Sequence, residues 1–154
     1  MSLWEKFEKE NCNLKNNNIR IRIDKGISKK LRKEYLSLIK YLRNKYVFPY
    51  RLNIYAVNKY QVKLMDGRLA WGKFHWYESK DSYIVIPSKI DKDELNGYTL
   101  EEEYTAVLGE LIHELTHYFQ WINSLTLTSI GRERQATKYA RYVLDDYAET
   151  REHP

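Results

Sequence analysis

Two histidines and a glutamate in the middle of the chain could together hold a metal ion and use it. Residues 113–117 read His-Glu-Leu-Thr-His, the pattern HExxH. On an α-helix each residue turns by about 100°, so positions four apart return to nearly the same face one turn along. His113 and His117 can therefore grip one ion, while Glu114 lies beside it. A carboxylate there can take a proton from activated water and pass it to a leaving amine. The spacing predicts a hydrolytic metal site.

The surrounding sequence is typical of a helix that would position this motif. Residues 100–122 are predicted as one helix, opened by Thr99 as N-cap with Glu102 three residues later, the capping-box arrangement. Apolar residues recur at helical spacing and predict a buried stripe: Val107, Leu111, Leu115, Tyr118 and Ile122. The two histidines lie off the centre of this stripe, as a site on the half-buried side of a core helix requires. The alternative is that they only face water or satisfy buried partners.

A catalytic zinc usually takes three protein ligands and keeps a fourth position open, so a third ligand must come from elsewhere. A second helix is predicted from Arg132 to about Arg151, with an inward stripe: Ala136, Ala140, Val143, Leu144 and Tyr147. Glu133 projects from the same stripe, and the small alanines would allow a close approach to the first helix. We therefore predict Glu133 as the third ligand. Two alternatives are a purely structural carboxylate at a helix start and ligation by His75 from a strand.

The two motifs together resemble a known group of enzymes. HELTH on one helix, followed by ERQATKYA on the next, is similar to the Glu-ligand zincins, or gluzincins, and most of all to minimal gluzincins and ImmA/IrrE-like metallopeptidases. The second motif matches their E-x-x-A-x-x-[FY]-A pattern at Glu133, Ala136, Tyr139 and Ala140. The resemblance covers roughly the last third of the chain. It implies a zincin-like fold, Zn²⁺ as cofactor, ligation by His113, His117 and Glu133, and Glu114 as general base.

The other elements predict an α+β fold in a single domain over residues 1–154, with residues 1–17 as a loosely packed N-terminal segment. A helix is expected over residues 28–46, and strands over 19–24, 51–57, 69–78 and 83–87, the last two forming a hairpin. The expected architecture is a short, mostly antiparallel sheet. It packs on an N-terminal helix and the HExxH helix, and a C-terminal helix carries the third ligand.

The same resemblance implies that an edge strand lies above the metal and binds the substrate backbone. The candidate is the strand that precedes the metal helix, with these substrate-binding residues: Ala70, Trp71, Gly72, Lys73 and Phe74. Its aromatic side chains, including that of Trp76, are expected to pack at least partly into the core, with subsite lining as the alternative. A group that stabilises the oxyanion is also required. Four residues are candidates between which the sequence does not choose: Arg132, Tyr139, Arg141 and Tyr142.

The composition bears on the compartment and the partners of the protein. The single Cys12 excludes an internal disulfide. The first residues interleave acids with lysines, which is not the pattern of a secretory signal peptide. No segment approaches the ~20 apolar residues of a membrane span. We expect a cytoplasmic, monomeric protein that has no membrane partner. The net charge of +5 comes from scattered basic residues. Their densest group, at residues 29–33, is expected to be a solvated helix face, so a nucleic-acid partner is less favoured than a protein or peptide substrate.

These observations predict a zinc-dependent endopeptidase. One alternative is a catalytically inactive zinc-binding scaffold that keeps the site without turnover. Another is a nucleic-acid-associated protease similar to the SprT-like family. SprT-like chains share the HExxH pattern but use a third histidine, and none stands between His117 and His153.

Overall fold

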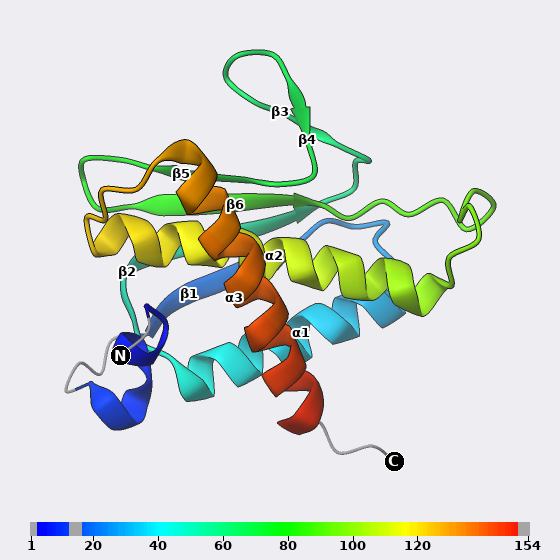
Figure 1. Cartoon of the computed structure of the whole chain (residues 1–154). Coiled ribbons are helices and arrows are strands. Elements are labelled where there is room, and N and C mark those ends of the chain that lie inside the picture. Colours follow the sequence, from blue (N-terminus) through cyan, green and yellow to red (C-terminus); the bar gives the residue numbers. More distant parts are fainter. Residues whose placement is uncertain (1–2, 13–16, 151–154) are drawn as a thin grey trace.

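A four-stranded sheet, with helices against one face, forms the body of the molecule (Figure 1). The computed structural model describes residues 3–12 and 17–150. The strand order is β1 (Asn17–Ile23), β2 (Phe48–Val57), β6 (Ser82–Pro87) and β5 (Lys73–Trp76). A separate two-stranded ribbon, β3 (Val62–Lys63) with β4 (Leu69–Ala70), stands off from this sheet in Figure 1. The chain therefore has the α+β class that its sequence predicts.

The strand directions differ from the expected, mostly antiparallel sheet. Within the four-stranded sheet, β2 runs parallel to both β1 and β6, and the β5–β6 pair is antiparallel. Helix α1 (Lys29–Lys45) joins β1 to β2 and returns the chain to the same end of the sheet, which makes that pair parallel. Alternation of apolar residues predicts which face of a strand is buried but not the direction of its neighbour. The prediction of a mostly antiparallel sheet was therefore wrong.

Three helices supply the other half of the core. Apolar residues at helical spacing on one side of α1 are all buried: Leu31, Tyr35, Leu38, Leu42 and, just after its end, Tyr46. Helix α2 (Leu100–Ile122) begins with the predicted capping box between Thr99 and Glu102. Helix α3 (Ser129–Thr150) begins three residues earlier than expected and crosses in front of α2 in Figure 1. None of the helices in the described ranges is long and apolar enough to cross a membrane.

The N-terminal segment packs against the back of the HExxH helix. Residues 3–12 form two short 3₁₀ helices, η1 (Glu5–Phe7) and η2 (Lys9–Asn11). Trp4 is fully buried, its ring contacts Phe119, and its indole Nε1 donates to Thr116 Oγ1 at 3.2 Å. Thr116 belongs to the motif itself. Leu3 and Trp4 thus anchor the segment in the core, whereas η1 and η2 contain no buried residue.

The strand expected over residues 69–78 is divided into two. Its first part, β4, pairs with β3, whereas β5 pairs with β6 through a turn at residues 77–81. The predicted hairpin between the third and fourth strands is confirmed in this shorter form. β5 is the terminal strand of the sheet order and packs beside α2. The sheet therefore presents an edge next to the HExxH helix.

Candidate metal centre

Helices α2 and α3 bring His113, His117 and Glu133 to one point. His113 Nε2 lies 2.9 Å from Glu133 Oε2, and His117 Nε2 lies 3.1 Å from Glu133 Oε1. One ligand atom from each residue falls within 4.8 Å of the other two, and among the described residues this is the one such group. Both imidazoles are mostly buried, while the Glu133 side chain is 61% exposed. The structure thus brings together the three residues that the sequence predicts as ligands.

The donor set fits a zinc ion in kind and in spacing. Imidazole nitrogen and carboxylate oxygen are common zinc ligands, with bonds of about 2.1 Å, so neighbouring ligand atoms in a tetrahedron lie about 3.4 Å apart. The two distances to Glu133 involve its two different oxygen atoms and are somewhat shorter than that separation, and one ligand atom from each residue lies within 4.8 Å of the others. Small outward movements of flexible side chains would open the remaining space. The partial exposure of Glu133 leaves one side of the group accessible for a further ligand.

Gln120 fixes the tautomer of His117. Its Nε2 donates to the Arg132 carbonyl oxygen at 3.0 Å and to Gln135 Oε1 at 2.8 Å. Because a carbonyl can only accept, the amide must be oriented with Oε1 toward His117 Nδ1, 2.8 Å away. Nδ1 therefore carries the proton. A metal-binding histidine is oriented in this way, with its second nitrogen donating to a fixed acceptor.

This tautomer leaves a lone pair on His117 Nε2 that faces the Glu133 carboxylate. Two acceptors at 3.1 Å repel each other unless a proton or a cation lies between them. Burial lowers the pKa of His117, which disfavours the extra proton. A cation held by both groups removes the repulsion. The hydrogen-bond network, as well as the donor set, therefore favours metal binding.

Glu114 lies beside these ligands and contacts none of them through a hydrogen bond. Its side chain is 7% exposed. Burial raises the pKa of Glu114 to about 8, and the carboxylates of Glu110 and Glu133 add to the effect. A bound cation would act in the opposite direction, because an opposite charge favours the ionised form. Glu114 is thus a carboxyl whose proton affinity lies in the range useful for general acid–base chemistry.

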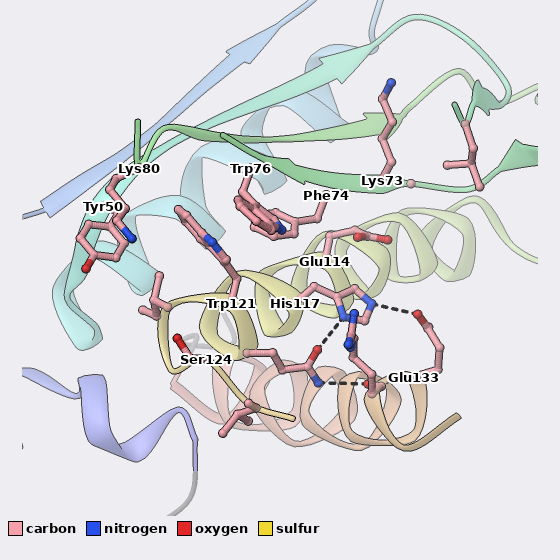
Figure 2. Close-up of a pocket in the computed structure, with 16 residues that line it drawn as sticks. Tyr50, Lys73, Phe74, Trp76, Lys80, Glu114, His117, Trp121, Ser124 and Glu133 are labelled. Carbon is pink, nitrogen blue, oxygen red and sulfur yellow. Dashed lines mark hydrogen bonds and ion pairs between the residues drawn. The ribbon is translucent and has the colours of Figure 1, made fainter. Parts of the chain in front are cut away.

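A cleft of about 790 Å³ opens onto these residues and is lined by Glu114, His117 and Glu133 at one end (Figure 2). Of the five predicted substrate-binding residues, Gly72, Lys73 and Phe74 line it. Ala70 instead pairs with Val62 in the β3–β4 ribbon, and Trp71 is 63% exposed outside the lining. The division of the expected strand explains this difference, since β5 and Gly72 just before it border the cleft, whereas β4 pairs with β3.

The other candidate residues separate clearly. His75 makes an edge-on ring contact with Tyr77 and a tilted one with Tyr83, and it is not part of the ligand group. Among the four oxyanion candidates, Arg132 lines the cleft. The hydroxyl of Tyr139 accepts from the Leu3 amide, Tyr142 is half exposed, and Arg141 lines a neighbouring depression on α3. Arg132 is therefore the cation among them that is placed to contact a ligand in the cleft.

Several residues of the cleft were not singled out from the sequence, among them Tyr50, Lys80, Gln120 and Trp121. Trp121 follows His117 by four positions, so counting one helical turn beyond the motif would have placed it on the same face. Tyr50 and Lys80 have no such local indication, because strand pairing brings them there.

Comparison with known proteins gives no assignment. No family model, no curated protein and no solved structure matches this chain.

Proposed function

We propose that the chain is a zinc-dependent endopeptidase of zincin-like architecture. The observation that supports this most is the convergence of His113, His117 and Glu133 within 4.8 Å, next to a buried Glu114. The two histidines come from one turn of α2, and the third ligand comes from the helix that crosses it. The adjoining sheet edge supports a peptide as the substrate, since an extended chain can add to it as a strand.

Each residue of the site has a separate role in the proposed peptide hydrolysis. A zinc ion bound there supplies a Lewis acid that activates water and polarises the scissile carbonyl. Glu114 takes the proton of the attacking water at its carboxylate and delivers it to the amine nitrogen as the carbon–nitrogen bond breaks. Gln120 holds the imidazole of His117 in the orientation that presents Nε2. Arg132 places a positive charge beside the reacting carbonyl, where negative charge develops.

The test compares the wild-type chain with Glu114→Gln. Both proteins are loaded with zinc and incubated with a pool of peptides derived from a proteome, and new termini are mapped by mass spectrometry. We expect the wild type to cleave, and the variant to retain zinc while its turnover falls about 10²- to 10⁴-fold, the usual contribution of a general base.

Two results would contradict the proposal. A fully zinc-loaded wild type that cleaves nothing in the pool would identify the chain as a binding protein. Equal turnover by the variant would remove Glu114 from the reaction. Zinc content is measured on the same samples, so that an empty site is not mistaken for an inactive enzyme.

A further inference from the structure

A group of aromatic rings lines the cleft beyond the metal ligands. Trp121 lies at its centre, in ring contact with Tyr50, Phe74 and Trp76 at centroid distances of 5.5, 5.9 and 5.7 Å. The Trp76 and Trp121 rings are stacked, with 19° between their planes. In Figure 2 these rings occupy the space between the metal ligands and Lys80. We call this group, Tyr50, Phe74, Trp76 and Trp121, the aromatic wall.

The aromatic wall differs from the core aromatics behind it. Phe48, Tyr118 and Phe119 are fully buried, whereas each ring of the wall keeps part of its surface open and Trp76 is 49% exposed. Large apolar rings that line a cleft beside polar groups are the usual composition of a ligand-binding surface. The wall is therefore suited to receive a flat or bulky apolar side chain.

The charge at this end of the cleft is positive. Lys80 Nζ lies over the Tyr50 ring, 5.5 Å from its centroid. Lys73 contributes its backbone to the cleft, but its ammonium lies on the other face of β5, over the ring of Tyr83 (Figure 2). Both carboxylates among the lining residues, Glu114 and Glu133, lie at the metal end. Among the lining residues, an acidic group that reaches the aromatic wall therefore meets Lys80 and no carboxylate. Asp81, the next residue in the turn, is outside this lining and pairs with Arg51 at 4.0 Å.

The backbone of Lys80 adopts a conformation that is uncommon for lysine. Lys80 has a φ of +71° in the β5–β6 turn, where its amide donates to the Tyr77 carbonyl at 3.0 Å. Glycine and asparagine adopt this left-handed conformation more easily than lysine. The turn thus carries a lysine at a position whose backbone conformation favours glycine or asparagine. This also provides a substitution, Lys80→Asn, that removes the charge while easing the backbone.

We infer that this end of the cleft selects extended peptide segments in which an aromatic or large aliphatic side chain lies close to an acidic one. The apolar side chain packs on the aromatic wall, and the carboxylate pairs with Lys80. The peptide backbone lies along the edge of β5. Reading such segments as the substrates rests on the proposed function, whereas their binding can be measured without turnover.

The experiment measures peptide affinity with the zinc-loaded, full-length Glu114→Gln protein, so that no peptide is consumed. Four capped decapeptides share one frame and carry Phe with Asp, Ala with Asp, Phe with Lys, or Phe with Asn. We expect the Phe/Asp peptide to bind about tenfold tighter than the Ala/Asp peptide, since buried aromatic contacts contribute on this scale. It should bind about threefold tighter than the Phe/Lys peptide, because an exposed ion pair is weak and screened by salt.

Two variants assign the two preferences. In the same background, Lys80→Asn should abolish the preference for Asp over Lys and keep that for Phe over Ala, with no loss of thermal stability. Trp76→Ala should abolish the preference for Phe over Ala and keep that for Asp over Lys. Lys33→Asn, at an exposed position on α1, removes the same single charge and should change neither preference. Equal affinity for the four peptides, or no binding by any of them, would overturn the inference. Hydrolysis of the tightest peptide by the wild type is scored separately, so failure of the proposed function is told apart from failure of this inference.

Discussion

The two ends of the cleft are built in different ways. At the metal end, hydrogen bonds from Gln120 tie His117 to the start of α3, next to Glu133. The side chains of the metal end come from two consecutive helices, α2 and α3. At the aromatic end, the rings come from β2, β5 and α2, and they touch one another through partly exposed faces. The first end is a connected polar network, and the second is an open apolar surface with one cation.

This difference indicates a division between reactivity and selection. Polar groups that position a reacting atom must be held within a fraction of an ångström, and a closed hydrogen-bond network achieves that. Apolar contacts are non-directional and tolerate a range of partners. Substitutions at the metal end should therefore change zinc binding and turnover, while those at the aromatic end should change the affinity for peptides and leave zinc in place.

The largest effect is expected from removal of a ligand. Glu133→Ala and His117→Ala should each weaken zinc binding by more than about 100-fold, beyond the loss typical of outer-shell partners. Trp76→Ala, at the aromatic end, should keep about one zinc per chain, the content expected for this site. Elemental analysis after dialysis measures all three beside the wild type. Zinc retained by Glu133→Ala would move the third ligand elsewhere, and zinc lost by Trp76→Ala would remove the proposed division.

A smaller effect on zinc affinity is expected from Gln120, which contacts a ligand and not the metal itself. Gln120→Met replaces the amide by an unbranched side chain of similar volume and removes the acceptor for His117 Nδ1. We expect zinc affinity to fall about 10- to 100-fold, as for other outer-shell partners of metal-binding histidines. Competition with a chelator of known affinity gives the dissociation constant.

Gln135→Leu is the matched control for this substitution. It removes the Gln120–Gln135 hydrogen bond but leaves the contact between Gln120 and His117. Its zinc affinity should stay near that of the wild type. If both variants lose zinc affinity equally, Gln120 acts by packing the two helices together rather than by orienting the imidazole.

The metal end could be predicted from the sequence because its geometry is local. The spacing of His113 and His117 follows from the pitch of one helix, and Thr99 with Glu102 fixes where that helix begins. Glu133 needed one further step, the inward stripe of the next helix, of which Ala136 is fully buried. Each of these steps depends on residues within a few turns of one another.

The aromatic end could not be predicted because it depends on which strands pair. Tyr50 and Lys80 reach the cleft through the register of β2, β6 and β5, and a strand's apolar alternation does not specify its neighbours. The division of the expected strand at Trp71 and Gly72 has the same cause. The burial of Trp4 could not be predicted for a related reason, since its ring partners lie far along the chain, at Tyr46 just after α1 and at Phe119 in α2.

The smallest expected effect is the difference in turnover between alanine substitutions at two glycines, Gly72 and Gly109. A Cβ added at Gly72 would lie 3.1 Å from Ile86 Cδ1 and 3.4 Å from Glu114 Cγ, so these neighbours must shift slightly. We expect Gly72→Ala to lower turnover a few-fold, about 1 kcal/mol or less in the barrier, because it displaces the general base. Zinc content should not change. Steady-state kinetics on a cleaved peptide, with zinc measured in parallel, test this.

Gly109→Ala is the control, because it adds the same methyl group within α2 but on the side toward α3. Its Cβ would meet Leu144 Cδ2 at 3.8 Å, an ordinary contact, and alanine is preferred to glycine inside a helix by about 1 kcal/mol. This variant should therefore be more stable to heat and equally active. If Gly72→Ala also left turnover unchanged, Glu114 would tolerate displacement, and the close approach of Gly72 to Glu114 would serve peptide binding alone.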